Sequence, residues 1–321
     1  MKIDRINLKK WNKTKIINNK INFKKIVYKF IILIIFLNLI YFIKNIKALI
    51  QNKINTNNNA CINIKNKLEN RTKPFDFENE LIFFTELIMC KIPFSFIRFG
   101  DGENSIMKGN KFDAQKDNWH WKYQNKEFQN KLIESSSICT NPNNFIGIPC
   151  KNWIDISKSI LSFSKCSSSK YMSYATLFIN KNYQIFKEWI LHFINTSNRW
   201  KIILVANSII NYDIKWAYKF FPVPDHLIEN WDKYSKFLLQ KLSVQAIEND
   251  LIFFISAGPS ANIIISHLTK INNKNIYIDF GSSIEFITKG YTTRVYAKSG
   301  KTSYQSCESF FIQNKSLIYT K

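Results

Sequence analysis

The sequence predicts an α/β fold, and three observations lead to this prediction. Apolar runs of strand length alternate with segments whose apolar residues recur at helical spacing. Two of these runs end in glycine-bearing loops, "FGDGE" and "SAGPSA". Residues 251–280 have the order strand, tight loop, helix and strand, which is typical of a βαβ unit. We therefore expect a ligand crevice at the carboxyl ends of the strands.

The remaining elements follow from periodicity and from turn residues, taken in chain order. Amphipathic spacing predicts helices over residues 75–91, 127–138, 153–164, 183–195 and 229–249. Short apolar runs predict strands over 94–99, 145–149, 171–178 and 201–207, and two prolines favour an extended backbone over 220–224. The βαβ unit divides into strand 251–255, loop 256–259, helix 260–271 and strand 276–280.

An apolar run near the N-terminus predicts a membrane anchor over residues 26–47. No charged residue lies between Phe30 and Ile43, but a spanning helix needs about 20 residues. Extending the run back to residue 26 supplies this length if the Lys29 ammonium reaches the membrane surface. Two alternatives stay open. A cleaved signal peptide lacks a small-residue cleavage site here, and an interfacial helix would need a polar face.

The segments beside this run set the expected topology. Residues 1–25 are rich in lysine and hold one acidic residue, Asp4, so the positive-inside rule keeps this basic tail in the cytosol. Residues 48–74 are polar and of low complexity, and we expect a stem there. Residues 75–321 would then form the body of a single-pass type II membrane protein, in a lumen such as that of the Golgi or the ER.

Charge and cysteine usage bear on partners and compartment. The formal net charge of +23 would ordinarily indicate a polyanionic partner. The lysines are scattered through the chain without an interleaved aromatic stripe, so we expect no nucleic-acid partner. The six cysteines show no zinc spacing; Cys139 and Cys150 are the nearest disulfide candidates, with buried free thiols as the alternative. Triplets that would carry N-glycans in a lumenal body begin at Asn70, Asn195 and Asn314.

The stretch "GDGE" follows the first predicted strand. In an extended or turn backbone, residues two apart point to the same side, so Asp101 and Glu103 would present two carboxylates to one point. Gly100 and Gly102 would let a ligand approach the backbone. Two hard oxygen ligands suit Mg²⁺ or Mn²⁺ bound to a diphosphate, and Arg98 would add a planar phosphate contact. A plain surface turn is the competing interpretation.

The second loop lies between a strand and a helix. Backbone N–H groups of Ser256, Ala257 and Gly258 would meet a phosphate at the helix N-terminus, and Ser260 would add a hydroxyl. An ordinary capped βα turn is the alternative. Asp279, at the end of the next strand, would hold a ribose hydroxyl or act as a base. A capping aspartate is the plainer interpretation.

Four segments in order resemble the glycosyltransferases of the GT-D fold, long described as a conserved domain of unknown function. They read "FSFIRFGDGE", "FFPVPDHLIENWDKY", "IFFISAGPSANIIISHL" and "NIYIDFGSSIEFITKGYTTRVY", and they cover about residues 80–300. The resemblance implies a Rossmann-like single catalytic domain of hexosyltransferase type. It also implies a nucleotide-diphosphate sugar, a UDP-sugar above all, and a glycan or glycoprotein acceptor.

The resemblance assigns roles to individual residues. The metal- and diphosphate-binding D-x-E motif of the family falls on Asp101 and Glu103, and its arginine falls on Arg98. The glycine loop falls on residues 256–258, and the late acid on Asp279.

The chain also departs from the family's pattern. Gln115 stands where a histidine is expected. An acid, Asp113 or Asp279, is therefore expected to deprotonate the acceptor hydroxyl. The alternative bases are His120 and His226.

Two other functions stay open. A methyltransferase that uses S-adenosylmethionine would need the same βαβ unit but no divalent metal. A non-catalytic membrane glycoprotein or pseudoenzyme would bind a polyanion in a salt-dependent way and would tolerate the loss of Asp101. Metal dependence separates the methyltransferase from the glycosyltransferase, and salt-dependent binding with tolerance of Asp101 loss would indicate the non-catalytic protein.

Overall fold

The computed structural model describes residues 58–114, 119–121, 125–150, 153–196, 200–207, 214–224, 226–292 and 294–298. The chain divides between Ile62 and Asn63, and the description below concerns the part that begins at Asn63. The predicted basic tail and membrane anchor, and Gln115, lie outside the described residues. Within the described ranges, no helix combines the length and apolar character that crossing a membrane requires.

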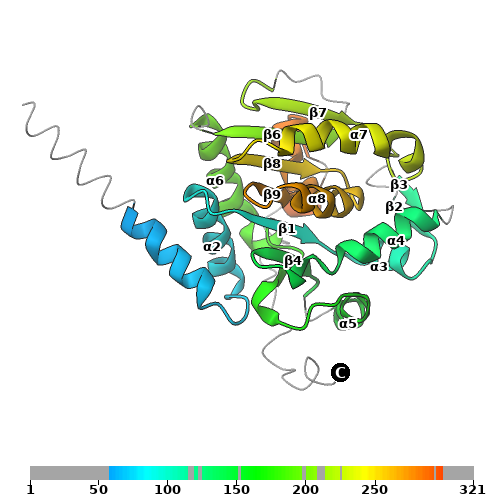
Figure 1. The fold of residues 1–321 in the computed structure, drawn as a ribbon, viewed down its shortest axis with the longest axis horizontal. Coiled ribbons are helices and arrows are strands. Elements are labelled where there is room, and N and C mark those ends of the chain that lie inside the picture. The colour runs from blue at the N-terminus through cyan, green and yellow to red at the C-terminus, as the bar shows by residue number, and fades with distance from the viewer. Residues whose placement is uncertain are drawn as a thin grey trace, which may run out of the picture. The chain divides into compact units, whose positions relative to one another are not determined.

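A seven-stranded parallel sheet lies at the centre of this domain, in the order β5-β4-β1-β9-β8-β6-β7 (Figure 1). From β1 the chain moves outward to β4 and β5, and the later strands fill the other side of β1. On that side, β6 is followed by β7 and β8 is followed by β9, so the connections after the neighbouring strands β6 and β8 run in opposite directions. The ends of β6 and β8 are therefore the topological switch point, where such sheets bind ligands. The predicted α/β, Rossmann-like class is confirmed. The strands are β1 (Phe94–Arg98), β4 (Asn144–Ile148), β5 (Met172–Tyr174), β6 (Lys201–Asn207), β7 (Lys219–Val223), β8 (Leu251–Ser256) and β9 (Ile276–Asp279).

Helices cover both faces of the sheet, because its central strands are apolar on both sides. On β8, Phe253 and Ile255 face a core shared with α7 and α8, whereas Phe254 faces a second core shared with α2 and α6. The helices are α2 (Phe77–Met89), α3 (Asp101–Met107), α4 (Lys126–Ser135), α5 (Ile154–Phe163), α6 (Tyr183–Asn195), α7 (Trp231–Ala246), α8 (Ser260–Ile271), α9 (Glu285–Thr288) and α10 (Val295–Lys298). Short 3₁₀ turns lie at Ile138–Thr140, Ser169–Tyr171, Asn180–Asn182 and Gly281–Ile284.

Several predicted elements differ from those observed. The strand expected over 171–178 ends at Tyr174. The segment expected to be extended over 220–224 is the edge strand β7, where Pro222 is tolerated because edge positions leave N–H groups without ladder partners. Among the elements that were not predicted are helix α3, which begins inside "GDGE", and the antiparallel hairpin of β2 (Phe112–Ala114) and β3 (Trp119–Trp121). The short helices α9 and α10 were not predicted either.

Part of the predicted stem is folded. Residues 58–69 are helical. Ile64 and Leu68 from this helix are buried in the same core as α2 and α6. Their spacing of four residues places them on one helix face. The part of the 48–74 segment that includes them thus packs on the domain and does not act as a free spacer.

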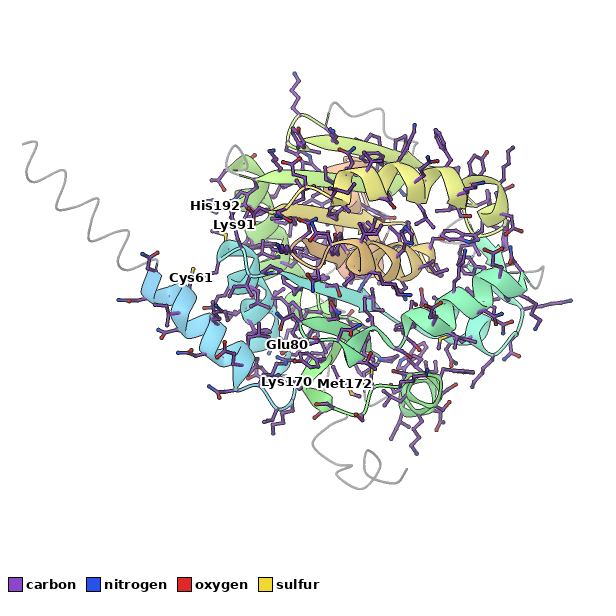
Figure 2. All side chains as sticks on the ribbon, viewed as in Figure 1. Cys61, Glu80, Lys91, Lys170, Met172 and His192 are labelled. Carbon is purple, nitrogen blue, oxygen red and sulfur yellow. A yellow bond between two sulfur atoms is a disulfide. The ribbon has the colours of Figure 1, made fainter. Side chains whose placement is uncertain are left out.

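Arg71, which follows this helix, forms a buried ion pair with Glu80 of α2. Its guanidinium donates to the two carboxylate oxygens at 2.8 and 2.6 Å, and both side chains are fully buried. It also donates to the carbonyls of Lys170 (2.7 Å) and Met172 (2.9 Å), which Figure 2 labels beside Glu80. Three aromatic rings lie within 5.4 Å of the guanidinium: those of Phe75, Phe83 and Phe145. The pair joins α2 to the sheet edge at β5.

The disulfide pattern differs from the expectation. Cys139 is bonded to Cys166, across a Cα–Cα distance of 5.7 Å, and not to Cys150. Cys61, Cys90 and Cys150 are disulfide-bonded as well, and no cysteine among the described residues is free. The alternative of buried free thiols is therefore wrong for these residues.

Candidate functional site

A cavity of about 550 Å³ opens at the carboxyl ends of the central strands. The ends of β1, β6 and β8 contribute Arg98, Asn207 and Ser256 to its lining, and Gly281 follows β9. The cavity thus lies at the switch point of the sheet, and its volume falls within the roughly 300–1,000 Å³ typical of small-molecule sites.

The structure brings most of the predicted site residues together. Of eleven, eight line this cavity: Arg98, Asp101, Gly102, Glu103, Asp113, Ser256, Ala257 and Gly258. The other three do not line the cavity, but each is either next in the chain to a lining residue or bonded to one. They are Gly100, Ser260 and Asp279.

The "GDGE" stretch begins helix α3, with Gly100 as its N-cap. Glu103 Oε2 accepts the Gly100 N–H at 2.8 Å, and Asp101 Oδ1 accepts the Gly102 N–H at 3.0 Å. The expected extended or turn backbone is wrong, because Asp101 and Glu103 lie on a helix. Residues two apart on a helix are turned by about 200° from each other, so the two side chains do not point to the same side. Both side chains nevertheless line the cavity, since the first turn of the helix faces it. Glu103 thus has a capping role as well as a place in the site.

Burial raises the pKa of the Glu103 carboxyl from its ordinary value of 4.5 to about 7. The N–H groups of Glu103 and Gly100 oppose this shift; farther away, Asp279 adds to it and Arg98 reduces it. A carboxyl with such a pKa holds its proton in part at neutral pH. It is therefore a group that a bound cation would ionise.

This shift predicts a pH dependence of stability for the ligand-free chain. Between pH 4.5 and 7 the folded state binds the Glu103 proton more tightly than the unfolded state does, so the stabilising contribution is present below this range and is lost as the pH rises through it. We expect the difference in free energy of unfolding between wild type and Glu103→Gln to fall from pH 4.5 to 7 and to be constant above. Urea unfolding in chelator at several pH values measures it. A difference that rises with pH would contradict the assignment.

Arg98, which lines the cavity, forms an ion pair with Asp279, which is buried and does not line it. Arg98 Nε and Nη2 lie 3.1 and 3.3 Å from the two oxygens of the buried Asp279 carboxylate, and Nη1 donates to the Ala175 carbonyl at 3.2 Å. Asp279 Oδ1 also accepts the Gly281 N–H at 2.9 Å. Burial raises the pKa of Asp279, and Arg98 and the Gly281 N–H oppose the shift. The carboxylate therefore holds Arg98 at the cavity wall.

Gly281 leaves the room that Arg98 occupies. Its φ of +49° lies in the left-handed region, and a Cβ there would lie 2.0 Å from Arg98 Nη2. We expect Gly281→Ala to lose about 1–2 kcal/mol of stability from the backbone alone and, in addition, to displace the guanidinium from Asp279. Gly109→Ala is the control, because its φ is also positive (+73°) but its nearest neighbour is the Gln129 amide at 3.3 Å. Urea unfolding of both variants measures the effect, and equal losses would contradict the account.

The loop after β8 is tied to this pair. Ser256 Oγ donates to the Gly281 carbonyl at 2.8 Å. Gly258 has a φ of +54°, which a residue with a side chain rarely adopts, and α8 then starts at Ser260. Ser260 is fully buried, and its Oγ has no hydrogen-bond partner within the described part of the chain. Ser256, Ala257 and Gly258 line the cavity, whereas Ser260, the first residue of α8, does not.

Two further cations line the cavity near Glu285. The Lys289 ammonium lies 3.3 Å from Glu285 Oε1, and Arg294 Nε lies 3.6 Å from Oε2. With Arg98, they place three positive side chains on one cavity, a composition suited to phosphate oxygens. Sequence reasoning did not assign a role to Lys289 or Arg294, although Arg294 lies in the last resembling segment.

Asp113 belongs to the unpredicted hairpin. Its Oδ1 lies 2.5 Å from His120 Nδ1, its cross-strand partner. The His120 ring stacks on that of His226, with centroids 5.9 Å apart, and His226 Nδ1 lies 3.3 Å from Glu229 Oε1. Asp113 and His226 line the cavity. The predicted acid Asp113 therefore contacts one alternative base, His120, and the His120 ring stacks on the other, His226.

The donor set can be compared with the needs of a divalent cation. In the described ranges no three His, Cys, Asp or Glu side chains are gathered around one metal position. The cavity offers Asp101 and Glu103 close together in the chain. In phosphate sites, Mg²⁺ typically takes one or two carboxylates and completes its shell with water and phosphate oxygens. The residues thus fit a cation that is held jointly with a bound diphosphate, and not a protein-only metal site.

Comparisons with known proteins give the following. No protein-family model matches the chain, and no curated protein matches it. It is similar to two solved structures of the domain of unknown function 1792, one of them substituted with selenomethionine and the other described as having a distinct glycosyltransferase fold. Each match covers 79% of this chain and 96% of the other, at 14% identity and a TM-score of 0.46. Because both values are low, residue roles here rest on this chain's own geometry.

Proposed function

We propose that this chain is a glycosyltransferase that takes its sugar from a nucleotide-diphosphate donor. One observation carries the proposal: the cavity at the switch point combines the carboxylates of Asp101 and Glu103 with three cations and a glycine loop. Such a lining suits a diphosphate with a divalent cation better than a neutral ligand. The four resembling segments support the same assignment, since all four contribute residues to the cavity.

Each part of the lining has a role in donor binding. Arg98, fixed by Asp279, and the pair Lys289 and Arg294 would contact the diphosphate oxygens. The loop residues Ser256, Ala257 and Gly258, which line the cavity before α8, would contact a second phosphate oxygen through their backbone N–H groups. Asp101 and Glu103 would hold the cation, Mn²⁺ or Mg²⁺, which when bound neutralises the diphosphate and favours its departure.

The reaction follows from this arrangement. The acceptor oxygen forms a bond to the anomeric carbon of the sugar, and the bond from that carbon to the diphosphate breaks, with its electron pair leaving on the nucleoside diphosphate. The three cations stabilise the negative charge that develops on the leaving group. We propose a hexose as the transferred sugar, UDP as the nucleotide, and a glycan or glycoprotein as the acceptor.

We also propose that the domain works in a lumen behind the 26–47 anchor. The Cys139–Cys166 disulfide supports this, because disulfides persist in oxidising compartments. Asn70 and Asn195, which begin two glycosylation triplets, are both exposed. An oxidising lumen suits an enzyme whose acceptors are glycans.

Donor turnover by the full chain tests the proposal. The chain is incubated with UDP-glucose, UDP-galactose, UDP-N-acetylglucosamine, GDP-mannose and GDP-fucose, in Mn²⁺ and in EDTA, and released nucleoside diphosphate is measured. We expect hydrolysis of one donor that requires Mn²⁺. Release of no diphosphate, together with metal-independent binding of S-adenosylmethionine, would favour the methyltransferase instead.

A further inference from the structure

Two imidazoles meet at the edge of the cavity from distant parts of the chain. His120 lies on β3, and His226 lies after β7; their rings are nearly parallel, at 21°, with centroids 5.9 Å apart. Each Nδ1 faces a carboxylate oxygen, His120 that of Asp113 and His226 that of Glu229. A carboxylate accepts hydrogen bonds, so each Nδ1 carries the proton and each Nε2 keeps a lone pair.

Glu229 holds both the His226 ring and the hairpin. Its Oε1 lies 3.3 Å from His226 Nδ1 and also accepts the backbone N–H of His120 at 2.5 Å. One carboxylate therefore fixes the ring in position and fixes the neighbouring hairpin against it. The Asn230 side chain adds a bond to the His226 carbonyl at 3.1 Å.

The backbone of His226 is itself strained. Its φ of +58° lies in the left-handed region, which few residues with side chains adopt. Backbone strain of this kind gathers at functional sites, where surrounding contacts maintain it. Here those contacts are the ones made by Glu229 and Asn230.

Of the two histidines, His226 lines the cavity. Asp113 lines it too, but its carboxylate is engaged by the His120 ring. Resting on the proposed glycosyltransferase function, we infer that His226 is the base that takes the proton of the attacking hydroxyl and that Glu229 is its positioning residue. His120 then packs its ring against that of His226, and Asp113 holds the His120 ring in place.

The proton transfer balances as follows. His226 Nε2 accepts the proton of the acceptor hydroxyl as the oxygen bonds to the anomeric carbon, and the nucleoside diphosphate leaves with the electron pair of the broken bond. The imidazolium so formed is stabilised by Glu229 and later releases its proton to water. The charged or titratable groups that face His226 are Glu229 on its own segment, His120 from β3 and, through His120, Asp113 from β2.

Donor hydrolysis tests the inference, because water then serves as the acceptor. His226→Asn removes the base and keeps a side chain that tolerates positive φ. We expect its hydrolysis rate at pH 7 to fall by roughly 10²-fold, the acid limb of the pH profile to disappear, and calorimetric UDP binding to stay unchanged. His192→Asn is the matched control, an exposed histidine near the end of α6. Hydrolysis by His226→Asn within about threefold of wild type, a smaller loss than removal of a general base causes, would overturn the inference.

Histidine NMR gives a readout that does not depend on turnover. The chain has four histidines, so single substitutions assign their ¹⁵N signals. We expect neutral His226 to be the Nδ1–H tautomer in wild type, and a mixture of both tautomers in Glu229→Ala, which lacks the accepting carboxylate oxygen. The Nε2–H tautomer in wild type, or an unchanged tautomer in Glu229→Ala, would contradict the inference. Absence of hydrolysis in wild type would instead count against the proposed function.

Discussion

Replacing Glu80 by glutamine is expected to lower the free energy of unfolding by about 3–5 kcal/mol. The reason is that Arg71 would keep its charge in a fully buried position, with its carbonyl partners but without a counter-charge. An uncompensated buried charge costs far more than a lost surface contact. Urea unfolding of the full chain at pH 7 measures the difference.

Two comparisons sharpen this prediction. Glu86→Gln breaks the exposed Lys67–Glu86 pair, and we expect a loss below about 1 kcal/mol. A double variant, Arg71→Met with Glu80→Leu, should be more stable than either single variant, because no charge stays buried. An effect of Glu80→Gln as small as that of Glu86→Gln would mean that the pair is not buried in solution.

Asp101→Asn is expected to lower metal-dependent donor hydrolysis by roughly 10²–10³-fold. Asparagine keeps the size of the side chain and an oxygen for the Gly102 N–H, so helix α3 should still form. What it removes is the negative charge that would bind the cation. The hydrolysis assay, run over a range of Mn²⁺ concentrations, measures both the rate and the metal requirement.

Asp155→Asn serves as the control for Asp101→Asn. Asp155 is an exposed acid in the first turn of α5, so the change alters a helix N-terminus in the same way, away from the cavity lining. We expect it to leave hydrolysis unaffected. Full metal-dependent turnover by Asp101→Asn would exclude Asp101 as a cation ligand.

The parts of the fold that local sequence determines could be predicted. Helices α6 and α8 and strand β6 have the predicted bounds, because their apolar periodicity is unbroken. The glycine loop at 256–258 could be predicted because it separates an apolar strand from a helix with clear apolar periodicity. The helical backbone of "GDGE" was not predicted. A capping box is recognised by serine or threonine at the N-cap, and here the N-cap residue is Gly100, so the capping role of Glu103 has no sequence signature.

Partners that are distant in sequence could not be predicted. Arg98 and Asp279 are 181 residues apart, and His120 and Glu229 are 109 apart. Their meeting depends on the order of the strands, which a single sequence does not specify. The same holds for Cys139, whose partner is not the nearer Cys150 but Cys166. The hairpin that carries Asp113 has strands of three residues each, "FDA" and "WHW", which are too short for their alternation of apolar and polar residues to predict strands.

The most direct test of the central claim is the binding of a nucleoside diphosphate to the cavity. Isothermal titration calorimetry of the full chain is carried out with UDP, GDP, ADP, CDP and dTDP, in Mn²⁺ and in EDTA, beside Asp101→Asn. The account predicts that one diphosphate binds in Mn²⁺, that EDTA abolishes or greatly weakens this binding, and that Asp101→Asn does the same. Binding of no diphosphate under any of these conditions would contradict it.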